Sequence, residues 1–96
     1  MPEFSASEKT IDWRSWSVVG AVKDQGRCGG DFAFSTAAAA ETAYAIKTGQ
    51  LYDLSEQYII DCDVGSFGCG GGFQKSSSLL LATDGAVLEK DYPYVG

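Results

Sequence analysis

The sequence contains no histidine and no asparagine, only two prolines, and few basic residues. Seven lysines and arginines stand against thirteen aspartates and glutamates, which gives a net charge of -6 at neutral pH. Because there is no basic stripe, the composition argues against binding to nucleic acid or to an anionic membrane. The uncharged stretches are too short and too polar to span a bilayer. Without histidine or a Cys-x-x-Cys pair, no metal site and no cofactor are expected.

The chain of 96 residues has the size of one small domain or of part of a larger one. Hydrophobic residues make up 45% of it, which is typical of a globular protein. A chain this short buries only about 60–65% of its unfolded surface, so a disulfide, a metal or a partner is needed for stability. Residues 1–10 are predicted to form a flexible N-terminal arm, and 11–96 the structured part. Met1 to Phe4 show no feature of a secretory signal peptide.

The clearest helix is predicted at about 31–48, where alanine is frequent and Gly49 supplies a C-terminal stop. Asp31 is expected at or near its N-cap, since a carboxylate accepts free backbone N–H groups there. The alanine run indicates a buried central helix, with Phe34 and Ile46 among its larger packing residues.

Two shorter helices are predicted, at about 55–61 with Ser55 as N-cap, and at about 73–83. Short extended segments are expected at 18–22 and 86–88. The coarse prediction is therefore a mainly α fold with long glycine-rich loops and little sheet.

Several short motifs follow one another along the chain. They are Asp12-Trp13-Arg14, the stretch Gln25 to Ser35, Leu54-Ser55-Glu56-Gln57 with Asp61-Cys62, Gly68-Cys69-Gly70-Gly71-Gly72, and Tyr92-Pro93-Tyr94. Each motif alone is a weak signal. Together, at their spacings, they make residues 11–96 resemble the papain (C1) family of cysteine peptidases.

The resemblance implies a fold of two halves, one helical and one β-rich, with the active-site cleft between them. This chain resembles the helical, left-hand half of that α+β fold, and the C-terminal β-rich half is absent from it. In the family the nucleophilic cysteine begins the central helix, and its histidine and asparagine partners come from the other half. The family's location would be lysosomal, vacuolar or extracellular, and a secreted form would have lost its targeting segment.

At the position of the nucleophile this chain has Asp31. A carboxylate there is also stabilised by the helix N-terminus, by about 0.3–1 kcal/mol in exposed settings. It is a poor nucleophile toward an amide, and no histidine is available as base. Gln25 matches the glutamine that lines the family's oxyanion hole, but without an oxyanion that role is lost.

The three cysteines, Cys28, Cys62 and Cys69, allow at most one bridge within the chain. By resemblance Cys28 pairs with Cys69 and closes a loop of about 40 residues, which stabilises by about 2–4 kcal/mol. Cys28 is thus predicted to be structural and not a substitute nucleophile. Cys62 is then an unpaired thiol, either buried or linked to a segment outside this chain.

The resemblance also implies a substrate groove at Gly71 and Gly72, whose backbone would pair with an extended peptide because glycine allows close approach. Phe73 and Gln74 fall where the family builds its specificity pocket. The alternative interpretation is that these glycines only let the loop turn beside Cys69.

Three hypotheses follow. The first is a catalytically inactive homologue that binds a protein partner across the surface of the missing half, or self-associates, and that can also bind extended peptides. The second is a subunit of a cysteine endopeptidase whose histidine and asparagine half lies on another chain or was lost by truncation. The third is a purely structural domain. The first is preferred, and the chain is predicted not to be an enzyme by itself.

Overall fold

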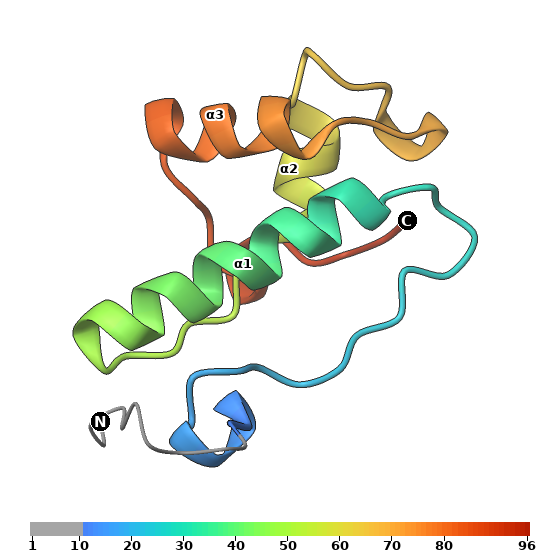
Figure 1. The fold of residues 1–96 in the computed structure, drawn as a ribbon. Coiled ribbons are helices and arrows are strands. Elements are labelled where there is room, and N and C mark those ends of the chain that lie inside the picture. The colour runs from blue at the N-terminus through green and yellow to red at the C-terminus, as the bar shows by residue number, and fades with distance from the viewer. Residues whose placement is uncertain (1–10) are drawn as a thin grey trace.

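A computed structural model describes residues 11–96, shown in Figure 1. The predicted arm, residues 1–10, lies outside the described residues. Three α-helices are present, α1 (Asp31–Thr48), α2 (Glu56–Cys62) and α3 (Gln74–Asp84). Short 3-10 helices occur at Trp13–Trp16, Gly68–Gly70 and Glu89–Asp91.

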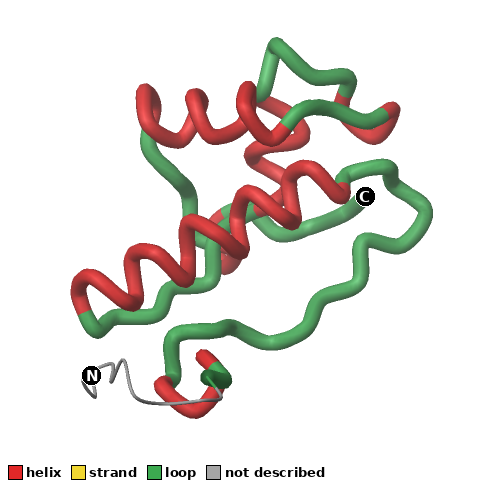
Figure 2. The backbone as a smooth tube through the Cα atoms, in the orientation of Figure 1, coloured by secondary structure: helices red, strands yellow, loops and turns green. Residues whose placement is uncertain are grey.

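Within residues 11–96 the structure contains no strand, and a single antiparallel bridge joins Leu54 to Leu88. The prediction of a mainly helical fold with little sheet is confirmed. Of the extended segment expected at 86–88, only Leu88 takes part in a bridge. The segment 18–22 is a loop that pairs with no strand among the described residues (Figure 2). None of the helices in this part of the chain is long and apolar enough to cross a membrane.

The ends of α1 follow from local chemistry. Gly49 adopts a left-handed conformation with φ of 78°, and its N–H donates to the Ala45 carbonyl at 2.8 Å. At the start, the N-cap is Gly30, so Asp31 lies next to the N-cap, within the range that the sequence predicted. Asp31 is the first helical residue, where its carboxylate still faces the positive end of the helix dipole.

The core lies where α1 packs against α2 and α3, and Figure 1 shows both of these helices on one side of α1. Small side chains from α1, Ala33 and Ala37, are fully buried beside Ile59 of α2. Small residues allow the helices to approach closely. The expected packing role of Ile46 is wrong, because this side chain is 37% exposed on the outer face of α1.

A disulfide joins Cys28, in the loop before α1, to Cys69 in the glycine-rich loop. The predicted pairing is therefore present. The Gly29 N–H donates to the Cys69 carbonyl at 2.9 Å, so the two loops also share a backbone hydrogen bond. Cys62, at the end of α2, is a free and exposed thiol, which rules out the alternative that it is buried.

Candidate functional site

The start of α1 presents Asp31 to solvent. Gly30 accepts hydrogen bonds from the N–H groups of Ala33 and Phe34, at 2.9 and 3.1 Å, and so opens the helix. The Asp31 side chain is exposed in the first turn, while Phe32 and Ala33 that follow it are buried. The carboxylate is thus displayed at the positive end of a helix that the core holds in place.

Gln25 lies in the loop that leads into α1, and its main chain and side chain are both held. Its Nε2 donates to the Cys28 carbonyl at 2.8 Å. The Tyr94 hydroxyl donates to the Gln25 carbonyl, so the C-terminal segment anchors this loop as well. A side-chain amide carries two N–H protons, and only one of those of Gln25 has an acceptor among residues 11–96, so the other is left for a ligand.

The glycine-rich loop passes beside the start of α1. A Cβ built on Gly72 would lie 2.4 Å from the Ser66 Cβ and 3.0 Å from the ring of Phe32, the residue after Asp31. Only glycine fits this space without a shift of its neighbours. The structure therefore brings the predicted groove residue Gly72 next to the helix start that carries Asp31.

In this loop the backbone of Gly71 is hydrogen-bonded within the chain, whereas that of Gly72 is not. The Phe67 N–H donates to the Gly71 carbonyl at 2.8 Å, which fixes the turn. The N–H and carbonyl of Gly72, in contrast, have no hydrogen-bond partner among residues 11–96. A free donor and acceptor on one residue match the pattern with which an extended peptide pairs.

Two exposed aromatic rings stand beside these glycines. Phe73 is 59% exposed and Phe67 is 72% exposed, and their ring centroids lie 6.4 Å apart in an edge-to-face arrangement. Gln74, also predicted at the groove, is the exposed first residue of α3. The four predicted groove residues thus form one continuous stretch with an apolar and accessible wall.

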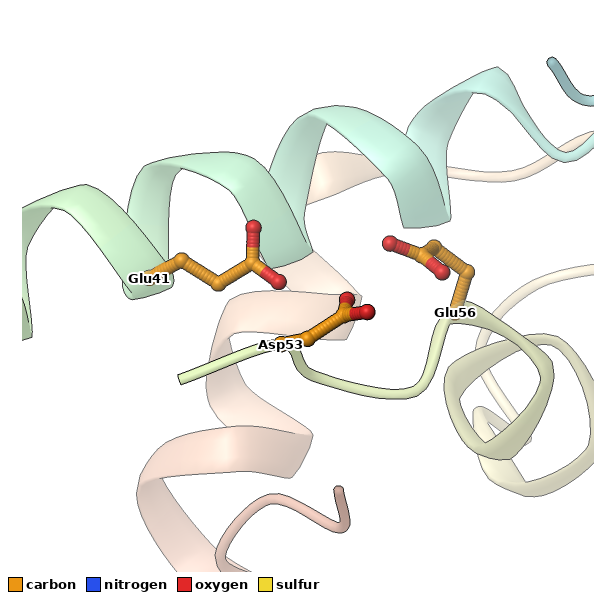
Figure 3. Close-up of side chains that lie close together, drawn as sticks. All are labelled: Glu41, Asp53 and Glu56. Atoms are coloured by element: carbon orange, nitrogen blue, oxygen red, sulfur yellow. The ribbon is translucent and has the colours of Figure 1, made fainter. Parts of the chain in front are cut away.

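A cluster of carboxylates that sequence reasoning missed lies on another part of α1. The carboxylate oxygens of Glu41, Asp53 and Glu56 all come within 4.8 Å of one another, and Figure 3 shows them pointing toward a common centre. The ammonium of Lys23 pairs with all three, at 2.6 Å from Glu56 and 3.8 Å from Glu41. Lys23 therefore takes the position that a metal ion would need.

The pKa values in this cluster are shifted by burial and by the shared cation. Burial raises the pKa of Glu41 and of Glu56, and their contacts with Lys23 only partly offset this. Burial alone would lower the pKa of Lys23, but hydrogen bonds to Asp53 and Glu56 outweigh it and raise this pKa. The directions are compatible because one ammonium is attracted by three carboxylates, whereas each carboxylate shares one ammonium.

No short-range pattern could have revealed this cluster. Lys23 is separated from its hydrogen-bond partners Asp53 and Glu56 by 30 and 33 residues, and the sequence shows only isolated charges at these positions. The cluster ties the segment before α1 to α1 and to the start of α2. Its role is to join elements of the fold.

Comparison with known proteins identifies the class. The family described as "Papain family cysteine protease" matches residues 7–96, so this chain belongs to the papain family of cysteine proteases. Chymopapain from Carica papaya is 48% identical over 86 residues, which are 90% of this chain and 24% of chymopapain. Chymomexicain from Jacaratia mexicana is 48% identical over 87 residues, which are 90% of this chain and 40% of chymomexicain.

Solved structures show the same relationship. A cysteine protease from Carica candamarcensis, CMS1MS2 in complex with E-64, aligns with a TM-score of 0.87 and 45% identity, over 88% of this chain and 40% of that one. The proform of the ragweed pollen allergen Amb a 11, a cysteine protease, aligns with a TM-score of 0.89 and 38% identity, over 97% of this chain and 29% of that one. The chain thus spans between 24% and 40% of the length of these four relatives.

Proposed function

We propose that this chain is a papain-like module without peptidase activity of its own, which works by binding. The observation that carries the proposal is Asp31, an exposed carboxylate in the first turn of α1, at the position where the resemblance places the nucleophilic cysteine. A helix N-terminus is a place that suits an anionic group, whether a thiolate or a carboxylate. The charge of the site is kept while its nucleophile is lost.

A carboxylate cannot replace the thiolate chemically. Attack on a peptide bond would form a mixed anhydride and expel an amine, and the amine must receive a proton as it leaves. The sequence contains no histidine to deliver that proton. Gln25 can still donate a hydrogen bond, but a donor aimed at an oxyanion accelerates nothing when no oxyanion forms.

The backbone and the aromatic side chains of the glycine-rich loop support a binding role. Gly72 carries an unpaired N–H and carbonyl, and Phe73 and Phe67 offer accessible apolar surface beside it. We propose that an extended peptide pairs with the Gly71–Gly72 backbone, with Phe73 and Gln74 next to one of its side chains.

An apolar pocket on the α3 side of α1 supports a second kind of partner. A pocket of about 590 Å³ opens between α1, α3 and the bridge segments, and its lining includes Tyr44, Tyr52 and Leu81. Exposed apolar surface of this kind is covered in most folded proteins. We propose a protein partner there, or self-association, and light scattering that finds only monomers at high concentration would contradict the latter.

The proposal is tested in a chimera that adds the remaining part of a related protease to this chain. The chain is joined to the part of chymomexicain that follows the matched region, and Cys62 is kept because the resemblance allows it to be linked to a segment outside this chain. Three forms are compared, with Asp31, Asp31→Cys and Asp31→Ala. Turnover of a fluorogenic dipeptide and the mass of the E-64 adduct are measured. Only Asp31→Cys is expected to react.

Each outcome separates the hypotheses. Turnover by the Asp31 form above the Asp31→Ala control would overturn the proposal and favour the alternative of an endopeptidase subunit completed by a second half. If Asp31→Cys gains neither turnover nor an adduct, the missing thiol is not what silences the site. Peptide titration of the chain itself separates a binding module from a purely structural domain.

A further inference from the structure

Asp63 is a buried carboxylate at the C-cap of α2, only 6% exposed, and it accepts four hydrogen bonds. The donors are the hydroxyls of Ser66 at 2.7 Å, Ser77 at 2.8 Å and Ser76, and the N–H of Gly65 at 3.2 Å. Burial alone would raise the pKa of Asp63, but these donors outweigh it and hold the pKa below its ordinary value. The group is therefore ionised at neutral pH and can only accept.

Two of these hydroxyls, those of Ser66 and Ser77, also contact the backbone of the groove residue Phe73. The Ser66 Oγ accepts a hydrogen bond from the Phe73 N–H at 3.1 Å. Ser77 donates to the Phe73 carbonyl through its N–H at 3.1 Å and its hydroxyl lies 3.3 Å from the same oxygen. A serine hydroxyl has one proton. Because Asp63 takes the proton of Ser66, a lone pair of that hydroxyl is left to face the Phe73 N–H.

The same serine defines the position of Gly72. Its Cβ and Oγ are the atoms that a side chain on Gly72 would meet, both at 2.4 Å. The neighbouring Phe67 N–H holds the Gly71 carbonyl at 2.8 Å. Residues 66 and 67 thus form the support on which Gly71 to Phe73 lie, and the hydroxyl at its centre is oriented by Asp63.

We propose that Asp63 is a positioning residue for the peptide groove, which acts through the Ser66 hydroxyl to fix Gly72 and Phe73. This inference rests on the proposed peptide-binding function. Asp63 contacts no ligand itself. Its carboxylate orients the Ser66 hydroxyl, and this hydroxyl fixes the position of the Phe73 N–H. The backbone groups of Gly72 are thereby held for pairing with an extended peptide.

The test is a double-mutant cycle in the 96-residue chain with Asp63→Asn, Ser66→Ala and both changes together. The probe is a fluorescein-labelled, blocked pentapeptide of alanines with a central leucine, and its dissociation constant is measured by anisotropy. Hydrogen exchange of the Phe73 amide is measured in parallel. Asp84→Asn, the same change at an exposed position at the end of α3, is the control.

Each single change is expected to weaken binding about tenfold, the scale of one lost hydrogen bond to a charged group. If Asp63 acts through Ser66, the double variant binds about as weakly as the weaker single variant. Exchange of the Phe73 amide then accelerates in all three. The control leaves both measurements unchanged.

A purely structural role of Asp63 predicts another result. The two effects would multiply to about a hundredfold, or affinity would stay within about twofold, and either result overturns the inference. If Asp63→Asn does not fold, Ser66→Ala still decides, because unchanged affinity contradicts the relay. If the wild-type chain does not bind the peptide, the proposed function fails, and the exchange cycle alone shows whether Asp63 positions Phe73 through Ser66.

Discussion

Gly72 shows how much one residue without a side chain contributes to this molecule. Its backbone lies against Ser66 on one side and against the Phe32 ring on the other. The contact connects the glycine-rich loop to the start of α1, where Asp31 is displayed. Any side chain at this position would push the glycine-rich loop away from Ser66 or from the Phe32 ring at the start of α1.

Substitution of Gly72 by alanine is therefore expected to lower the free energy of unfolding by about 1–3 kcal/mol, because the added methyl group overpacks a filled space. Urea denaturation measures the change. Gly70→Ala is the matched control, since its added Cβ would meet the nearest side-chain atom at an ordinary 3.5 Å. Equal effects of the two substitutions would show that the loop gives way at Gly72.

Residues placed by a motif could be predicted, and residues placed by the folded chain could not. Asp31 and Gly72 follow from short patterns in the sequence, and the structure brings them to one place. Asp63 and Lys23 have no such pattern, because their partners are set by how loops and helices meet. In the sequence, Asp63 is simply an acidic residue that follows Cys62.

At the scale of the elements, Lys23 joins parts of the chain that are far apart in sequence. It comes from the segment before α1, Glu41 from the middle of α1, and Glu56 from the first turn of α2. Glu41 also accepts a hydrogen bond from the Leu54 N–H at 2.6 Å. Two nearly buried glutamates thus depend on one ammonium.

Replacing Lys23 by methionine is expected to cost about 3 kcal/mol of unfolding free energy at neutral pH, because two buried carboxylates lose their cation. Lys75→Met, at an exposed position on α3, is the control and should change stability by less than about 0.5 kcal/mol. Urea midpoints of the two variants and the wild type give the comparison.

The loss should shrink in acid. Burial already raises the pKa of Glu41 and Glu56 above 4.5, and without Lys23 these pKa values rise further. A carboxyl group with a higher pKa in the folded than in the unfolded state stabilises the fold at low pH, and that contribution is lost as the pH rises through the folded pKa. Between neutral pH and pH 4.5 the variant should therefore approach the wild type, and a constant difference would contradict the argument.

The ends of the helices divide in the same way between local and tertiary causes. The end of α1 at Gly49 and the N-cap of α2 at Ser55, which accepts from the Tyr58 N–H at 3.0 Å, were both predicted from residue type. The start of α1 was predicted at about residue 31, as observed, but the sequence did not single out Gly30 as the N-cap because glycine has no side chain to accept a hydrogen bond. Ile46 was misplaced because the alanine run does not show which face of α1 is covered.

For the molecule as a whole, the disulfide between Cys28 and Cys69 is the main covalent constraint in the described residues. It links positions 41 residues apart and connects the loop before α1 to the glycine-rich loop. A chain of this size buries a small core, so a constraint on the unfolded state contributes a large share of its stability. Such a bridge persists in an oxidising compartment.

Cys28→Ala is expected to lower the unfolding free energy by about 2–4 kcal/mol. Reduction of the wild-type chain should lower it by a similar amount. Cys62→Ser, at the exposed free thiol, is the control and should stay within about 0.5 kcal/mol. If reduction leaves the urea midpoint unchanged, the disulfide does not stabilise the fold by restricting the unfolded chain.

The same bridge decides what happens when the chain is nicked. Val64 is fully exposed between α2 and the glycine-rich loop, in the kind of turn that proteases cut. Cleavage there leaves Cys28 on one piece and Cys69 on the other, so the cut molecule remains one covalent particle on a non-reducing gel. The pairing of Leu54 with Leu88 also spans the cut and keeps the two pieces in register. Cleaved molecules would thus be detected on a gel only after a reducing agent had separated the two fragments.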